Sequence, residues 1–545
     1  RMPDGRGHNR SVLAPGGIVY RVSPDGKKFE IVASGFRNIF DAGVNSDGDL
    51  FTYDADMEYD FNTSWYRPTR INHVVSGAEF GWRNGAGKYP EFYADTLPAT
   101  LNIGPGSPTG TTFGYGARFP AKYQSAFYVL DWSWGKIYAV HLEQSGATYT
   151  ATKEEFITGA PLPVTDAIIH KDGAMYFAIG GRRVQSGLYR VTYGGSEDTS
   201  PIDLTPKTNP ERDLRLSLAA LHGKQDPNAV ATAWPHLSSP DRFIRSAART
   251  VLEHQPVAEW QDKALSEADA TGQLEALIAL ARVASQNPQD SAMRDRILGA
   301  LLARDFASLT VEQKLAFVRL VEIVLHRFGN PDDATLQAII AKLDPSYPAE
   351  SFELNWLLTE TLAYLQAPNT AAKGMDLIAA AGSQEPQIEY ARSLRFLKTG
   401  WTKELRTQQL EWFLKAENFN GGASFSKFIE FIRNDSLDTF TDAEKTELAE
   451  LINKKAEKKS AIELSGAMFV GRTPTMWTLE ELSDAAKTGM KGRNFDNGRR
   501  MFAATACFAC HRFGNEGGMT GPDLTGAGGR YSPHDLLDQI SIRAK

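Results

Sequence analysis

Residues 41–51, DAGVNSDGDLF, recur in form 125 positions later as residues 166–176, DAIIHKDGAMY. In both copies an Asp-Ala pair, an Asp-Gly pair and an aromatic residue keep the same offsets, and Asp-Gly is typical of a turn between two strands. A shorter pattern, GIVYRV at 17–22, returns as GKIYAV at 135–140 and as GLYRV at 187–191. Strand–turn–strand units repeated at matched offsets predict a β-propeller, and a β-sandwich with similar hairpins is the alternative.

The predicted propeller region covers residues 1–195. Only about three units of this kind fit in that length, whereas closed propellers have about four to eight blades. We therefore expect a propeller that is incomplete at its N-terminus, with blades that precede Arg1 or with a ring completed in another way.

A helical period follows a linker at 196–208 and is expected to continue through residues 209–465. Asn209 before a proline and Ser239 before an apolar periodic stretch are expected helix caps, and Thr310 with a glutamine three positions later predicts a capping box. The helix starts recur every 30 to 40 residues, roughly the period of HEAT repeats. The pattern predicts a HEAT-like α-helical solenoid, which serves either as a spacer or as a docking surface.

The composition of the chain restricts its class. Of 545 residues, 42% are hydrophobic and 23% charged, and the mean hydropathy is −0.34. The formal net charge of −7 argues against a nucleic-acid partner, because such partners are usually bound by basic surfaces. We find no run of about 18 apolar residues, so we expect no membrane span.

The chain contains only two cysteines, and both stand in the sequence CFACH, Cys507 to His511. A structural zinc site would need four ligands, and no other cysteine is present. A thioredoxin-like pair would need a surrounding βαβ pattern, which we do not find. The motif therefore predicts covalent haem c, because two thiols on one turn can add to the two vinyl groups of a haem while His511 binds the iron.

The segment before this motif, NFDNGRRMFAATA, resembles the first helix of class I cytochromes c, which are all-α domains. The positions that carry the resemblance are Phe495, Gly498 and Phe502. In that family the glycine allows close helix packing and an aromatic ring covers the haem. The following GPDLTG implies that the carbonyl of Pro522 accepts a hydrogen bond from the proximal histidine, which would fix the imidazole ring.

The same resemblance implies a second axial ligand, usually a methionine several tens of residues after the histidine. Met519 is too close in sequence to reach the opposite haem face, and His534 is an alternative. We expect a methionine beyond Lys545. The cytochrome c domain at 494–545 would then be truncated, and a linker helix at 466–493 would precede it.

Three long segments give a wider resemblance: "SGFRNIFDAGVNSDGDLFTYDADMEYD", "SWYRPTRINHVVSGAEFGWR" and "IGPGSPTGTTFGYGARFPAKYQSAFYVLDWSWGKIYAVHL". They resemble the large propeller–haem proteins of planctomycetes and verrucomicrobia, described as membrane-bound dehydrogenases with a haem-binding tail. The propeller of that family is similar to the soluble sugar dehydrogenases that use pyrroloquinoline quinone (PQQ). The resemblance covers nearly the whole chain.

The resemblance implies that Arg37 and Asn38, in the segment GFRN, contact the quinone and substrate oxygens. A guanidinium suits that role because it can neutralise a developing alkoxide or a quinone carboxylate. Ile39 replaces the proline of the family motif, and neither His8 nor His73 lies in a motif that matches the general base. The alternative role for Arg37 is to cap a loop between blades.

Alternate acidic residues in YDADMEYD predict a candidate calcium site. Asp54 and Asp56 are its first members, and Glu58 and Asp60 continue the alternation. On an extended segment these side chains share one side, and clustered carboxylates suit a hard cation. A solvated acidic rim is the alternative.

These observations predict an exported redox protein, because haem c is attached outside the cytoplasm, so a periplasmic or other extracytoplasmic location is expected. It would oxidise a sugar or alcohol in the propeller with PQQ and calcium, and pass electrons through haem c to an external redox partner. The alternative is an electron-transfer or scaffold protein with a non-catalytic propeller and a docking solenoid.

Overall fold

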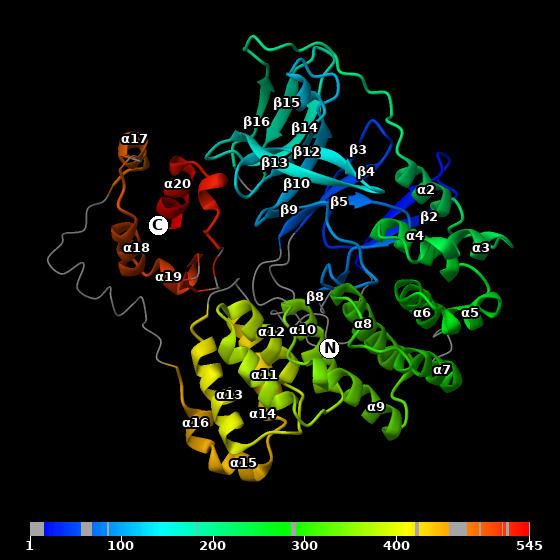
Figure 1. The fold of residues 1–545 in the computed structure, drawn as a ribbon. Coiled ribbons are helices and arrows are strands. Elements are labelled where there is room, and N and C mark those ends of the chain that lie inside the picture. The colour runs from blue at the N-terminus through cyan, green and yellow to red at the C-terminus, as the bar shows by residue number, and fades with distance from the viewer. Residues whose placement is uncertain are drawn as a thin grey trace.

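The computed structural model describes residues 16–55, 68–83, 87–181, 184–284, 290–419, 425–456, 477–489, 492–514, 516–518, 521 and 523–543. Figure 1 shows three parts in chain order: β-sheets, a helical region, and a C-terminal region drawn from orange to red. The multidomain order of sheets followed by helices is as predicted. The domain boundaries themselves stay a prediction.

The sheet region consists mainly of antiparallel ladders. The first four-stranded sheet has the order β3(Ala42–Val44), β4(Leu50–Asp54), β5(Thr69–Val74) and β9(Leu101–Gly104). The second is β10(Pro108–Phe113), β11(Phe127–Asp131), β12(Lys136–Ser145) and β13(Thr148–Thr158). The third sheet has three strands, β14(Val164–Ile169), β15(Met175–Ile179) and β16(Gly187–Val191).

Smaller elements complete this region. β1(Gly17–Val22) pairs with β2(Phe29–Phe36), which also pairs in parallel with β6(Ala78–Glu79). β7(Trp82–Arg83) pairs with β8(Gly87–Lys88), and the short helix α1(Ala121–Gln124) precedes β11.

The sequence repeat corresponds to a repeated hairpin. Gly48 and Gly173 make the turns of β3–β4 and β14–β15 with φ of +86° and +79°, a left-handed conformation that favours glycine. At the start of each hairpin an aspartate oxygen, from Asp41 or Asp166, accepts a hydrogen bond from the next backbone N–H at 2.8 Å. The matched offsets therefore preserve one local geometry.

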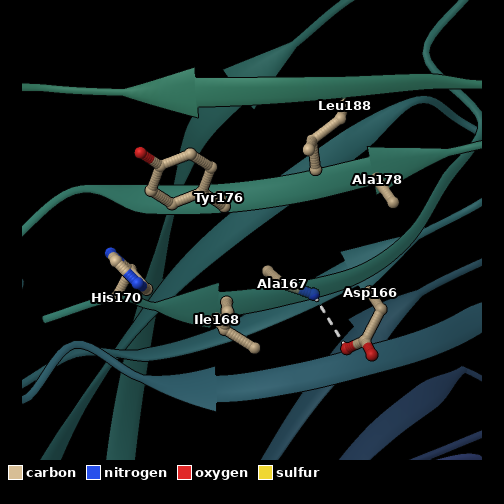
Figure 2. A pocket seen from close by; sticks show the side chains of 7 residues that line it. All are labelled: Asp166, Ala167, Ile168, His170, Tyr176, Ala178 and Leu188. Atoms are coloured by element: carbon tan, nitrogen blue, oxygen red, sulfur yellow. Dashed lines mark hydrogen bonds between the residues drawn. The ribbon is translucent and has the colours of Figure 1, made fainter.

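Neighbouring sheets pack face to face, with β10 beside both β3 and β14. A Cβ atom on Gly43 would lie 2.8 Å from the ring of Phe127, so the first two sheets approach closely there. The equivalent residue in the third sheet is Ile168, which is 55% exposed. Figure 2 shows Ile168, Tyr176 and Leu188 on this open face, where they line a shallow pocket of about 430 Å³. The sheets resemble part of a propeller, and the propeller that is incomplete at its N-terminus stays a prediction.

The helical region contains the helices α2 to α16. Their bounds are α2(Pro210–Ala219), α3(Ala229–Ala233), α4(Arg242–Glu253), α5(Gln261–Ser266), α6(Ala270–Ala284), α7(Ser291–Leu302), α8(Val311–Phe328), α9(Asp333–Leu343), α10(Phe352–Tyr364), α11(Thr370–Ala380), α12(Gln384–Leu394), α13(Lys403–Ala416), α14(Phe425–Leu437), α15(Asp442–Glu447) and α16(Ala449–Asn453). Three 3₁₀ turns, η1(Trp234–His236), η2(Val257–Glu259) and η3(Asp344–Ser346), lie between them. The HEAT-like description of this order stays a prediction.

The predicted helix starts are largely confirmed. Asn209 caps α2 by accepting from the Arg212 N–H at 2.9 Å, and Thr310 forms the predicted capping box at α8. The prediction of Ser239 as the cap of α4 was wrong. Asp241 has that role and accepts from the Phe243 N–H at 2.8 Å, because a carboxylate two residues later reaches the free N–H groups of the first turn.

The C-terminal region contains α17(Leu479–Gly489), α18(Phe495–Ala504), the single-turn α19(Cys507–Cys510), the small ladder of β17(Arg512–Phe513) and β18(Glu516–Gly517), the 3₁₀ turn η4(Ala527–Gly529) and α20(Pro533–Arg543). α17 packs against α20, and α18 against α19. Within the described residues, no helix is both long enough and apolar enough to cross a membrane.

Candidate haem attachment site

The two cysteines occupy the ends of one helical turn. Ala506 adopts a left-handed conformation with φ of +58°, and the chain then enters α19 at Cys507. The turn closes with a 2.8 Å hydrogen bond from the His511 N–H to the Cys507 carbonyl. Both cysteines are free thiols; that of Cys507 is half-buried and that of Cys510 exposed. Residues three apart on a helical turn lie on the same side, as two thioether bonds to one haem require.

A glycine-rich loop folds back over the histidine that follows. The Gly518 N–H donates to the Phe508 carbonyl at 2.7 Å, and the Gly521 N–H to the Cys510 carbonyl at 2.8 Å. A Cβ atom on Gly521 would lie 2.8 Å from Cε1 of the His511 ring, so only glycine lets the loop pass this close. Backbone contacts thus limit the orientations of the imidazole ring. Pro522, predicted to bind it, and Met519 lie outside the described residues.

The preceding helix supplies aromatic cover. Asn494 caps α18 by accepting from the Asn497 N–H at 2.8 Å. The Phe502 ring meets Phe508 edge to face at 4.7 Å between centroids, while Phe495 is 69% exposed. Within the described residues, nothing lies within 4 Å of a Cβ placed on Gly498, so the close helix packing expected there is not formed.

His534, the alternative second ligand, is engaged elsewhere through one nitrogen. Its Nδ1 lies 2.8 Å from the Ser483 hydroxyl, which ties the start of α20 to α17. Nε2 is the nitrogen with which this residue could bind iron.

The C-terminal residues fit a haem. They combine two accessible thiols on one turn, an adjacent imidazole packed by glycines, and aromatic side chains beside them. Residues 495–545 match the family model described as cytochrome c. This part of the chain is a cytochrome c domain, which implies a covalently bound haem c and haem-based electron transfer.

The candidate residues of the sheet region gather around one buried carboxylate. Asp54, at the end of β4, is fully buried and accepts from the backbone N–H groups of Arg37 at 3.1 Å and Asn38 at 3.0 Å. The buried guanidinium of Arg70 lies 3.5 Å from the same carboxylate. Asp54 therefore fixes the backbone of the loop before β3. Within the described residues, the hydrogen bonds of Arg37 and Asn38 to Asp54 are made by their backbone N–H groups and not by their side chains.

The candidate calcium residues and the two histidines nearest to the GFRN segment are only partly described by the structure. Asp56 lies outside the described residues, and the described part of the chain contains no group of three or more metal-ligating side chains. His73 is 1% exposed, with Nδ1 2.9 Å from the Thr148 hydroxyl and its ring stacked on Phe51 at 5.1 Å. Burial lowers its pKa. His73 is thus a core residue; His8 lies outside the described residues.

A second carboxylate of the same kind, not predicted from the sequence, lies in the next sheet. Asp131, at the end of β11, accepts from the backbone N–H groups of Ser107 at 3.0 Å and Ser133 at 2.9 Å. Burial raises its pKa. The signal was available, since both carboxylates end an apolar strand, LFTYD for Asp54 and FYVLD for Asp131.

Solved structures with some likeness to the sheet region include two sugar dehydrogenases. One, described as a putative oxidoreductase (glucose dehydrogenase) from Thermus thermophilus, has 15% identity and a TM-score of 0.24 over 30% of this chain and 47% of its own. The other, the PQQ-bound aldose sugar dehydrogenase of Streptomyces coelicolor, has 13% identity and a TM-score of 0.25 over 32% of this chain and 51% of its own. This chain thus spans about half of each. No curated protein matches the chain.

Proposed function

We propose that this protein is an exported c-type cytochrome joined to a dehydrogenase-like propeller, and that it carries electrons from a sugar or alcohol to an external acceptor. The observation that carries the proposal is the Cys507–Cys510 turn with His511 packed against Gly521, within residues that match cytochrome c. The extracytoplasmic location follows from the compartment in which haem c is attached.

Each residue of the C-terminal site has a defined part. The thiols of Cys507 and Cys510 would form the thioether bonds, and the ring of His511, packed against the glycine loop, would bind the iron. The carbonyl of Pro522 is the proposed acceptor for the other ring nitrogen. When bound, the haem supplies one-electron exchange between Fe(III) and Fe(II).

The proposed substrate site is the loop before β3. Oxidation of an alcohol to a carbonyl releases two electrons and two protons, so PQQ, when bound, would accept the pair. Arg37 would neutralise negative charge on the quinone or alkoxide, and Asn38 would donate to a substrate oxygen. Asp54 would hold the backbone of both residues in position through its two hydrogen bonds. A calcium ion at Asp54 and Asp56 would have to compete with those backbone hydrogen bonds.

The second candidate function, an electron-transfer or scaffold protein, is favoured by one observation. His73 is buried in the core opposite Phe51, whereas Asp54, which binds the loop of Arg37, is paired with Arg70 at the other end of β5, so His73 is not placed as a general base for that loop. In that case the sheets would bind no oxidisable substrate, and electrons would reach the haem from another protein.

Haem spectroscopy on the full chain tests both proposals. The protein is produced with a haem-attachment system, supplied with PQQ and calcium, and mixed with a panel of sugars and alcohols. We expect the α-band of ferrous haem to appear in the wild type and to be lost in the Arg37→Ala, Asn38→Ala double variant. A haem that dithionite reduces but no substrate reduces would favour the scaffold function. Covalent haem in a Cys507→Ser, Cys510→Ser variant would refute the attachment site.

A further inference from the structure

Among the described residues, the 3₁₀ turn η4 and the adjacent Arg530 connect the C-terminal region to the sheets. The Leu162 N–H, in the β13–β14 connection, donates to the Gly529 carbonyl at 3.0 Å. The guanidinium of Arg530 lies over the ring of Trp132, 5.4 Å from its centroid. A Cβ atom on Gly529 would lie 2.4 Å from the Ser133 carbonyl oxygen, so η4 packs directly on the β11–β12 connection. Figure 1 shows the red C-terminal segment beside the sheets.

The connections at this contact lie at one end of the strands. In an antiparallel sheet, the start of the first strand, the link between the second and third, and the end of the fourth share an end. The connections before β10, between β11 and β12, and between β13 and β14 are therefore neighbours. Hydrogen bonds join these connections. The Trp132 N–H donates to the Ser107 carbonyl at 3.0 Å, and the Gly159 N–H donates to the Gly135 carbonyl at 3.0 Å.

The same rule places the proposed substrate loop at this end, because β9, the fourth strand of the first sheet, ends at Gly104 and the short connection 105–107 leads directly into β10. Arg37 and Asn38 lead into the first strand of the first sheet, and Asp54 ends the second strand. Asp131 ends the second strand of the next sheet and binds its preceding connection in the same way as Asp54 does. We call the end formed by residues 37–41, 105–107, 132–135, 159–163 and 180–181 the loop face.

We propose that the loop face is the docking site of the chain's own cytochrome c domain, and that η4 with Arg530 is its docking element. The occupant is identified by contacts already present, because the Leu162–Gly529 hydrogen bond and the Arg530–Trp132 contact join the two. The consequence for electron transfer rests on the proposed function: the haem domain sits on the same face as Arg37 and Asn38. Electrons would then leave the sheets for the haem without a separate carrier.

The sequence supplies a matched pair of variants for a test. Gly529 and Gly528 are neighbours in η4, but within the described residues a Cβ on Gly528 meets nothing within 4 Å. Gly529→Ala therefore puts a methyl group into the backbone of the β11–β12 connection, and Gly528→Ala puts one into open space. Both substitutions replace glycine by alanine, so they lower the conformational entropy of the unfolded chain by the same amount.

Hydrogen exchange of the full-length haem protein reads out the contact. Pro161 and Pro163 have no amide hydrogen, so a peptide over 160–163 reports mainly on Leu162. We expect its exchange to be at least tenfold faster in Gly529→Ala than in the wild type or Gly528→Ala. Exchange in the β11–β12 ladder should be unchanged, which shows that the sheet stays folded.

Equal exchange at Leu162 in the wild type and Gly529→Ala would overturn the docking proposal. If Gly529→Ala does not fold, Arg530→Gln replaces it, and an unchanged Leu162 rate there has the same meaning. The docking proposal and the proposed function can be refuted independently, because they are tested by different measurements. Fast Leu162 exchange only in Gly529→Ala supports docking even if no substrate reduces the haem, and substrate reduction of the haem is tested independently of Leu162.

Discussion

His222 provides a sharp test of how the sheets and the helical region are held together. It follows α2, is 8% exposed, and has Nδ1 2.9 Å from the Ser76 hydroxyl of the sheet region. Its Nε2 lies 3.0 Å from the Ala247 carbonyl of α4, so the neutral ring donates from Nε2 and accepts at Nδ1. Burial lowers the pKa of His222 to about 4, and the nearby ring of His254 adds to the effect.

The size and sign of the pH effect follow from this shift. In the unfolded chain His222 is protonated near the ordinary histidine pKa of about 6.5, whereas in the folded protein it is protonated only near pH 4. The unfolded state therefore gains stability as the pH falls between these values. At about 1.4 kcal/mol per pKa unit, His222 lowers the free energy of unfolding by about 3 kcal/mol between pH 7 and pH 4. The full stability is present above about pH 6.5.

Urea unfolding at pH 7 and pH 4, followed by the circular dichroism of the helices, measures this loss. His222→Gln keeps a donor and an acceptor at the site but cannot titrate, so its loss between the two pH values should be about 3 kcal/mol smaller than that of the wild type. His236→Gln, at a half-exposed histidine of the same region, is the control and should match the wild type. Equal losses in His222→Gln and His236→Gln would refute the reasoning.

Two further predictions concern buried contacts. Asp95→Asn removes the negative charge that faces the Arg319 guanidinium at 2.9 and 3.1 Å. It should lower the free energy of unfolding by about 3 kcal/mol, which urea unfolding would show as a lower midpoint. An unchanged midpoint would contradict a buried ion pair at this position. Gly521→Ala should displace the His511 ring and lower the yield of covalent haem several-fold in a pyridine haemochrome assay, whereas Gly498→Ala, whose Cβ meets open space within the described residues, should keep the wild-type yield.

The sequence could predict features whose evidence is local. CFACH specifies a single turn with two thiols and a histidine, because all three groups lie within five consecutive residues. The hairpin repeat was readable for the same reason, since Asp41 and Asp166 each bind the very next backbone N–H.

The role of Asp54 could not be predicted in the same way. Its partners Arg37, Asn38 and Arg70 are 16 or 17 positions away and are brought together only by the pairing of β4 with its neighbours. From the sequence, the carboxylate is the first member of an acidic cluster open to a cation. In the structure it is the fixed centre of a loop, because a buried carboxylate must find donors.

The helical region contacts the sheet region through buried polar and aromatic side chains. Residues 89–97 of the sheet region lie along the helical region: the Arg249 guanidinium donates to the Ala94 carbonyl at 2.8 Å, Arg319 pairs with Asp95, and the Phe92 ring meets Trp356 at 5.5 Å. These contacts bury charged groups of the helical region against the sheet region, so the two regions pack directly on each other. That the helices also form a docking surface for another protein stays a prediction.

The cytochrome c domain is attached in a physically different way. Separating the helical region from the sheets would strand buried charges such as Arg215, which lies 2.9 Å from Asp49, at a cost of about 3–5 kcal/mol for a broken buried pair. Among the described residues, releasing η4 from the loop face breaks the Leu162–Gly529 hydrogen bond and the Arg530–Trp132 contact, together about 1–3 kcal/mol. The contact stabilises docking by less than this sum, because Nε of Arg530 is buried without an acceptor among the described residues. A contact of this strength opens and closes readily. Under the proposed docking and function, the haem domain would sit on the loop face to receive an electron and would leave it to meet an external acceptor.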